Sequence, residues 1–179
     1  PLGLTLTAGS NSGSLLDLTT NVTTPTITGT AQPLATVSIY DGNTLVGTAT
    51  ANALGVWSAT LKVLPDGVHN LTAKATIGAQ TSADSVALAI TIDTTPPPVP
   101  VITSGLQTNV LLPVLTGTAE AGALLSIQIG GATYNTVAVG GAWSLNLATA
   151  VPILGNLVLN ANGTNTVRVS ATDVAGNVS

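Results

Sequence analysis

The chain has 179 residues, of which 45% are hydrophobic, yet it contains no Phe, Met or Cys and only two Trp and two Tyr. Three basic residues stand against seven acidic ones, and this net charge of −4 excludes the clustered basic surface that binding to nucleic acid or an anionic membrane requires. Disulfides are excluded as well, and no apolar run reaches the roughly 18 residues that span a bilayer, so we expect no membrane insertion.

The first half of the chain is predicted to form seven strands. Apolar and polar residues alternate with a period of two, which is the pattern of strands with one buried face, and no stretch has helical periodicity. Glycine and Asx residues that suit tight turns lie between the alternating segments, at Asp41-Gly42, Asn52 to Gly55 and Asp66-Gly67. The predicted strands lie near residues 2–8, 24–30, 34–40, 44–51, 55–61, 67–76 and 84–92.

The second half repeats the first. PTITGTA at 25–31 returns as PVLTGTA at 113–119, an offset of 113 − 25 = 88, and GVWS at 55–58 returns as GAWS at 141–144, an offset of 141 − 55 = 86. A repeat of roughly 90 residues is too long for a solenoid unit and suits a whole small domain. The sequence therefore predicts an all-β chain of two tandem immunoglobulin-like antiparallel β-sandwiches, joined end to end by a short Pro-rich linker.

The predicted boundaries follow from the prolines. We expect the first repeat at 1–93, a stiff linker at 94–100 and the second repeat at 101–179, because consecutive prolines favour an extended path. The turn at Gly67 returns at Gly163, an offset of 163 − 67 = 96, so about ten residues are inserted in the second repeat. That repeat lacks a counterpart of the last strand, so either the fragment is cut one strand short or another segment fills the edge.

Catalysis is close to excluded by the residue types present. With one His, no Cys and few acids, the chain has almost no groups for proton transfer or nucleophilic attack. His69 follows a turn and is replaced by Asn165 in the second repeat, so turn polarity is its expected role. Trp57 and Trp143 are expected to be core anchors.

Several motifs together resemble the bacterial Ig-like repeats of giant biofilm-associated adhesins, and the resemblance covers essentially the whole chain. The motifs are TGTA at 28–31 and 116–119, G-x-W-S at 55–58 and 141–144, D-G-x-H at 66–69, D-T-T-P-P at 93–97 and T-D-x-A-G-N at 172–177. The resemblance implies non-catalytic extension modules of a surface protein that a type I system secretes, on the outer membrane of Gram-negative bacteria. It implies a role in adhesion and biofilm formation, with neighbouring Ig-like repeats as partners and no indication of the host receptor.

Repeats of this family often bind Ca²⁺ between successive domains, which implies candidate ligands here. Each repeat is predicted to have an odd number of antiparallel strands, so the chain enters the sandwich at one end and leaves it at the opposite end. Carboxylates at the end where the chain leaves the first repeat, and at the end where it enters the second, are therefore predicted to converge on the linker. Such a set of oxygen ligands is what Ca²⁺ requires. The candidates are Asp93 and Asp173, which fit the family motif, with Glu120 and Asp66 as additions. The alternative is that these acids only cap turns.

Two other functions stay open at this stage. A chain with 6% charged residues and a mean hydropathy of +0.54 has a weakly solvated surface, so homophilic cell-cell adhesion is one alternative. A carbohydrate-binding module is the other, and Tyr40 and Tyr134 are the candidate exposed aromatics for it.

Overall fold

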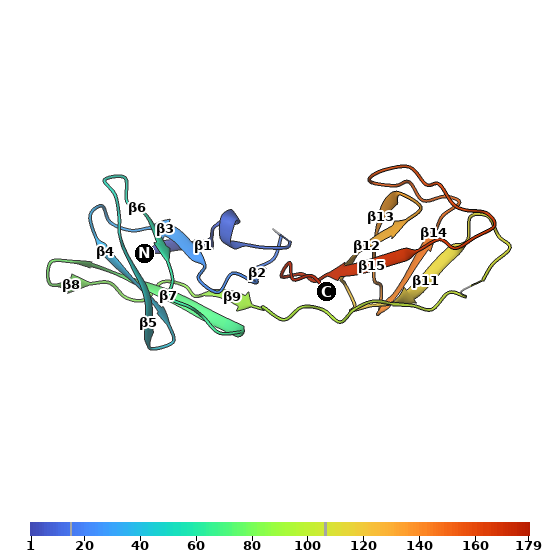
Figure 1. Ribbon diagram of the computed structural model, residues 1–179. Helices are drawn as coiled ribbons and strands as arrows, with labels where there is room; N and C mark the ends of the chain where they lie inside the picture. Colours follow the sequence, from blue (N-terminus) through green and yellow to red (C-terminus); the bar gives the residue numbers. More distant parts are fainter. Residues whose placement is uncertain (15, 106) are drawn as a thin grey trace. The chain divides into compact units, whose positions relative to one another are not determined.

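The computed structural model describes residues 1–14, 16–105 and 107–179 (Figure 1). The chain divides into two compact units, Pro1–Thr94 and Thr95–Ser179. This division falls within the predicted linker 94–100, in a segment without strands. Each unit is an all-β sandwich with its own hydrophobic core, as the alternating sequence predicts.

Unit 1 consists of two facing sheets. One has the strand order β1-β3-β6 and the other the order β2-β9-β7-β4-β5, with β8 paired to β7. All pairings are antiparallel except that of β2 with β9. The strands are β1 (Leu2–Leu6), β2 (Thr19–Thr20), β3 (Thr26–Thr30), β4 (Thr36–Asp41), β5 (Thr44–Thr50), β6 (Val56–Thr60), β7 (Gly67–Ile77), β8 (Gln80–Thr81) and β9 (Leu88–Ile92).

All seven predicted strands of the first repeat are present. Glycine adopts the left-handed conformation in each of the predicted turns, with φ of 56° at Gly42, 79° at Gly55 and 134° at Gly67. The sequence does not predict the short strands β2 and β8, because each has two residues, which are too few to establish an alternating pattern. A short 3₁₀ turn, η1 (Ala8–Ser10), follows β1.

Glycine and tryptophan form the same pair in both units. Gly29 of β3 lies opposite Trp57 of β6, and the indole packs so closely that an added Cβ on Gly29 would lie 2.7 Å from Trp57 Cζ2. Trp57 is 2% exposed and belongs to the core of unit 1, which confirms it as an anchor. The G of TGTA and the W of G-x-W-S are therefore two halves of one contact.

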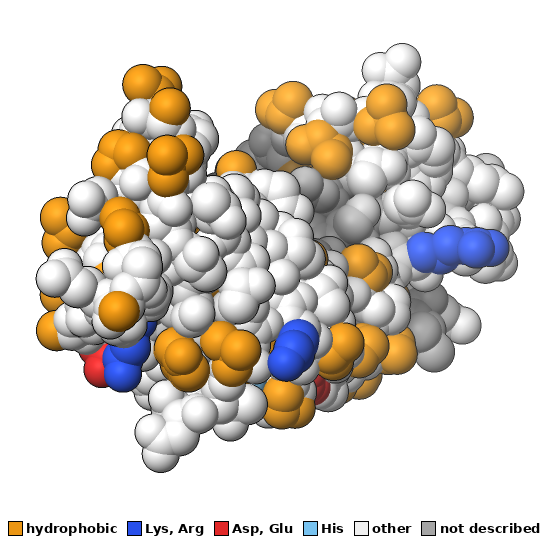
Figure 2. Space-filling model, turned by 90° about the vertical axis from the view of Figure 1, so that its left-hand side faces the viewer, with side chains coloured by type: hydrophobic (Ala, Val, Ile, Leu, Met, Phe, Trp, Pro, Cys, Tyr) orange, Lys and Arg blue, Asp and Glu red, His pale blue; other side chains and the backbone are white. Residues whose placement is uncertain are grey.

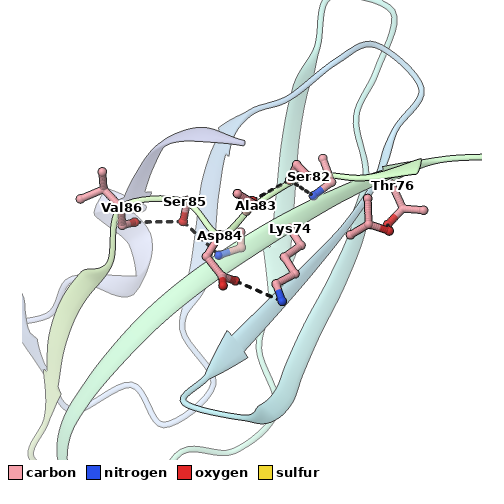
Figure 3. A network of polar contacts seen from close by, with 10 residues as sticks. Lys74, Thr76, Ser82, Ala83, Asp84, Ser85 and Val86 are labelled. Atoms are coloured by element: carbon pink, nitrogen blue, oxygen red, sulfur yellow. Dashed lines mark hydrogen bonds and ion pairs between the residues drawn. The ribbon is translucent and has the colours of Figure 1, made fainter. Parts of the chain in front are cut away.

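The last predicted strand of unit 1 starts later than expected. Residues 82–87 run beside β7 without forming a strand, because serine hydroxyls replace backbone carbonyls as acceptors (Figure 3). Ser82 Oγ accepts the Ala75 N–H and Ser85 Oγ accepts the Ala73 N–H, both at 3.0 Å. The regular strand β9 begins only at Leu88.

Unit 2 repeats this plan with fewer strands. One sheet has the order β10-β11-β14 and the other the order β13-β12-β15, all antiparallel. Gly117 of β11 lies opposite Trp143 of β14, and an added Cβ would collide with that indole and with the Val101 carbonyl. The strands are β10 (Val101–Ile102), β11 (Val114–Thr118), β12 (Leu124–Ile129), β13 (Ala132–Val137), β14 (Ala142–Asn146) and β15 (Val167–Thr172).

The insertion of the second repeat covers the outer edge of β13. Ile153 N–H donates to the Thr133 carbonyl, and Val158 N–H donates to the Gly130 carbonyl, both at 2.8 Å. Leu157 of this segment packs against the core of unit 2. The extra residues thus give β13 a partner along part of its length.

Substituting Gly29 with Ala should lower the free energy of unfolding of unit 1 by about 1–3 kcal/mol, because the rigid indole of Trp57 has no room to yield. A urea titration followed by NMR reports each unit separately, because each contains one indole N–H. Gly9→Ala is the control, since an added Cβ there meets nothing within 4 Å. Equal midpoints for the two variants would contradict the packing role.

Candidate functional site

The candidate carboxylates of unit 1 lie near its last residues. Asp66 precedes β7, and its carboxylate accepts bonds from Thr94 N–H at 3.3 Å and from Thr94 Oγ1 at 2.8 Å. Asp93 directly follows β9, and its N–H donates to the Thr20 carbonyl at 2.9 Å. Asp66 therefore holds the segment that follows β9 against the turn before β7.

The two candidates of unit 2 differ in burial. Asp173 is 8% exposed, and its carboxylate accepts bonds from Asn177 N–H and Asn177 Nδ2, both at 2.8 Å. Asn177 Nδ2 also donates to the Thr95 carbonyl at 3.4 Å. Glu120 lies exposed in the turn after β11, and among the described residues its carboxylate has no hydrogen-bond or ion-pair partner.

The hydrogen bonds of two of the four candidate acids agree with the alternative prediction, in which these acids only cap turns. Asp173 closes the turn that ends at Asn177, and Asp66 ties Thr94 to the start of β7. In the described part of the chain, no three His, Asp or Glu side chains form a group suited to a metal ion. Calcium binding by Asp93, Asp173, Glu120 and Asp66 stays a prediction.

The most distinctive polar pair is one that sequence reasoning missed. His69 of β7 is 6% exposed, and its Nδ1 lies 2.7 Å from Asp41 Oδ2 at the end of β4, while its Nε2 lies 2.8 Å from the Pro65 carbonyl. A carboxylate and a carbonyl are both acceptors, so both ring nitrogens must donate and the imidazole is charged. The predicted role in turn polarity is therefore too weak, since His69 forms a partly buried ion pair in which the Asp41 side chain is 30% exposed.

Burial lowers the pKa of His69, because it removes the charged ring from water. The hydrogen bonds from the ring to Asp41 and to the Pro65 carbonyl, with the charge of Asp41, outweigh that loss and hold the pKa of His69 above its ordinary value of 6.5. With both nitrogens donating, the ring has no free lone pair to act as a base. The arrangement ties β4, β7 and the preceding loop together.

The two tyrosines do not form a shared platform for a sugar. Tyr134 lies on β13 and is 2% exposed, so it belongs to the core of unit 2. Tyr40 is half-buried, and Lys74 Nζ lies 5.8 Å above its ring. Figure 3 shows Lys74 directed toward Asp84, and the two charged groups are 3.6 Å apart.

The surface carries few charged and many exposed apolar side chains. On the face that Figure 2 shows, apolar groups are spread between uncharged atoms, charged side chains are few, and at the lower left an acidic side chain lies beside a basic one. Large apolar side chains at least 70% exposed occur in both units, and they include Leu34, Leu54, Val86, Val139, Val151 and Leu154. Within the described residues, no helix has the length and apolarity needed to cross a membrane.

Residues 1–94 match the family model described as a bacterial Ig-like domain. The chain belongs to the bacterial Ig-like domain family. This assignment agrees with the two-sheet sandwich and with the Gly29–Trp57 contact inside the matched region. The resemblance stated from the motifs is thus confirmed at the level of the bacterial Ig-like repeat.

Two solved structures are similar to this Ig-like chain. Fibronectin(III)-like modules of CbhA from Clostridium thermocellum have a TM-score of 0.55 at 16% identity, over 99% of this chain and 89% of that one. This likeness confirms the fold class. The BSP domain of a biofilm-associated protein has a TM-score of 0.32 at 17% identity, over 89% of this chain and 26% of that one. No curated protein matches the sequence.

The stability of unit 1 should depend on pH through His69. Because its folded pKa is raised, the ion pair contributes fully below about pH 6.5 and its contribution is lost as the pH rises through the folded value. Urea denaturation from pH 5.5 to pH 9 should show unit 1 weakening toward the alkaline end.

His69→Asn, which installs the residue found at position 165, should remove this dependence and cost about 1.5–3 kcal/mol at pH 6, the usual range for a hydrogen bond to a charged group. Unit 2 contains no His and is the internal control. A pH profile of unit 1 that survives the substitution would assign the effect to other groups.

Proposed function

We propose that this chain is a pair of extension repeats from a large bacterial cell-surface adhesin that takes part in adhesion and biofilm formation without catalysis. The observation that carries the proposal is that each unit closes its own core around the same glycine–tryptophan contact. A module with its own core can be repeated many times, and repetition is how a chain gains reach. The adhesin motifs in both repeats add support.

The proposed setting follows from the same resemblance. The parent protein is secreted by a type I system and stays at the outer membrane of a Gram-negative bacterium, where neighbouring Ig-like repeats are its partners. The His69 ring has no free nitrogen, which supports a non-catalytic role. The family assignment and the sandwich fold support a modular surface protein but name no receptor.

Homophilic adhesion is the second candidate, and the exposed apolar side chains favour it. Val86, Val139 and Val151 are each about four-fifths exposed or more, and charged residues that would oppose contact between copies make up only 6% of the chain. Carbohydrate binding is less supported, because Tyr134 is buried and leaves Tyr40 as the single partly accessible tyrosine. A glycan array without hits on the chain is the expected result.

Calcium binding is a further part of the proposal. Asp93 and Asp173 are the proposed ligands, with Glu120 and Asp66 as additions and backbone carbonyls completing the shell. The free carboxylate of Glu120 supports this, since it loses no contact among the described residues when it binds a cation. The proposed role of the ion is to restrict the relative motion of the repeats and so to lengthen the average reach.

A spacer should be extended in solution. Small-angle scattering of the whole chain is expected to give a radius of gyration above about 20 Å, whereas one compact globule of this length would give about 16 Å. The forward scattering should correspond to a monomer at every concentration. A value near that of the globule would contradict the spacer, and a mass that rises with concentration would favour homophilic adhesion.

Calcium should bind with measurable heat in isothermal titration of the chelator-treated chain, and Glu120→Gln and Asp93→Asn should each weaken binding at least about tenfold. Asp84→Asn is the matched control, because Asp84 pairs with Lys74 and is not a proposed ligand. The scattering profile should become more compact and variable in chelator. No heat, or equal affinity in all variants, would rule out the calcium proposal and leave the spacer proposal standing.

A further inference from the structure

The loop that connects β14 to β15 contains the one Asn-Gly dipeptide of the chain (Figure 1). This loop spans residues 147–166, and Asn162 and Gly163 lie exposed in a turn within it. Gly163 corresponds to Gly67 of unit 1 with an offset of 163 − 67 = 96, so Asn162 corresponds to Asp66. The loop thus has an exposed side-chain amide next to a residue that has no side chain.

The side chain of Asn162 is unrestrained in the described structure. In unit 1 both aspartates that precede a glycine, Asp41 and Asp66, use their carboxylates as hydrogen-bond acceptors. Among the described residues, the side-chain amide of Asn162 has no hydrogen-bond partner, and only its backbone N–H is bonded, to Asn160 Oδ1 at 3.2 Å. Asn162 Cγ can therefore rotate toward the main chain of Gly163.

The nitrogen of Gly163 is weakly bonded as well. It lies 3.4 Å from the Asn160 carbonyl oxygen, which is longer than an ordinary N–H···O bond of about 2.7–3.2 Å. That carbonyl also accepts a bond from Asn165 Nδ2 at 3.0 Å. An added Cβ on Gly163 would collide with Asn160 Nδ2, so the turn requires a glycine here. The close packing of the loop thus places an unhindered nitrogen directly after Asn162.

No other asparagine in the described part of the chain combines an unbonded side chain with a following glycine. The side chains of Asn11, Asn52, Asn146, Asn160, Asn165 and Asn177 are hydrogen-bonded. Those of Asn21, Asn43, Asn70, Asn109, Asn135 and Asn156 are not, but each of these residues is followed by Val, Thr or Leu. A branched side chain on the following residue hinders the approach of its nitrogen.

We propose that Asn162 is a site of spontaneous deamidation, a modification that the chain carries out on itself with water as the only co-reactant. The Gly163 nitrogen loses its proton and attacks Asn162 Cγ. The N–Cγ bond forms, the Cγ–Nδ2 bond breaks, and ammonia leaves with the proton. Water then opens the cyclic imide at either of its two carbonyl carbons. Opening at Cγ gives aspartate at position 162, and opening at the main-chain carbonyl carbon gives isoaspartate.

Both products put a carboxylate on a part of the molecule that has no charge. No Asp, Glu, Lys, Arg or His lies between Glu120 and Arg168, so the net charge of the whole chain changes from −4 to −4 − 1 = −5 through this stretch alone. Aspartate at position 162 gives unit 2 the acid that unit 1 has at Asp66. Isoaspartate also lengthens the main chain by one carbon, which moves the Gly163 nitrogen away from the Asn160 carbonyl.

The whole chain should be incubated between pH 6 and pH 9 and mapped by mass spectrometry, with a fragmentation method that distinguishes aspartate from isoaspartate. Asn162 should convert at least about tenfold faster than any other asparagine, because glycine leaves its own nitrogen unhindered. Isoaspartate should be among the products. The rate should rise with pH, because the attacking nitrogen must lose its proton. In NMR the amides of residues 160–166 should shift as the reaction proceeds, and those of unit 1 should not.

Two variants test the requirement for glycine. Gly163→Ala should slow the conversion of Asn162 at least about tenfold, because the added Cβ hinders the attack. That variant also displaces the Asn160 amide, so the second variant leaves this loop unchanged. Thr44→Gly places a glycine after Asn43, which is exposed and has no side-chain hydrogen bond among the described residues. Asn43 should then deamidate at a rate similar to that of Asn162.

Three results would overturn the proposal. The first is an Asn162 that stays unmodified in the folded chain but converts in urea, since the fold would then hold the nitrogen away from Cγ. The second is conversion to aspartate without isoaspartate, which would assign the change to direct hydrolysis of the side-chain amide. The third is an equal rate at Asn162 with glycine or alanine at position 163, together with no reaction at Asn43 in the Thr44→Gly variant.

Discussion

The contact between a glycine and a tryptophan on neighbouring strands is the constraint on which both units depend. In a chain without Phe or Met, Trp57 and Trp143 are the largest core side chains, and Gly29 and Gly117 leave the space in which the indoles lie. Neither buried indole Nε1 has a hydrogen-bond partner in the described structure, at a cost of about 1–3 kcal/mol. That the same cost occurs twice shows that the apolar packing of the ring outweighs it.

The two units differ where their sheets end. In unit 1 the edge of β7 is covered by β9, after a segment in which Ser82 and Ser85 substitute hydroxyls for carbonyls. In unit 2 the extra residues cover the outer edge of β13, which has no such cover in unit 1's plan of strands. The sandwich centre is therefore repeated closely, and the variation is confined to the edges, where strand pairing to other segments is decided.

The sequence predicted the strands well because their signals are local. A period of two identifies a strand, and a left-handed glycine such as Gly42 marks the turn between two of them. The ion pair of His69 and Asp41 was missed because 28 residues separate the partners, and their contact depends on the register between β7 and β4. The sequence also identified the carboxylates that lie next to turns. It does not show whether they cap the turns or bind a cation, because both roles use the same carboxylate oxygens.

The two units have different side chains at the positions that form the ion pair in unit 1. With offsets of 88 and 96, Asp41 corresponds to Ile129 and His69 to Asn165. Ile129 is 5% exposed and lies in the core of unit 2, so an apolar side chain replaces the carboxylate. Asn165, no longer facing a charge, bonds Asn160 of the inserted segment at 2.8 Å. A histidine here would have no carboxylate partner, so the charged pair and the pH response that follows from it belong to unit 1.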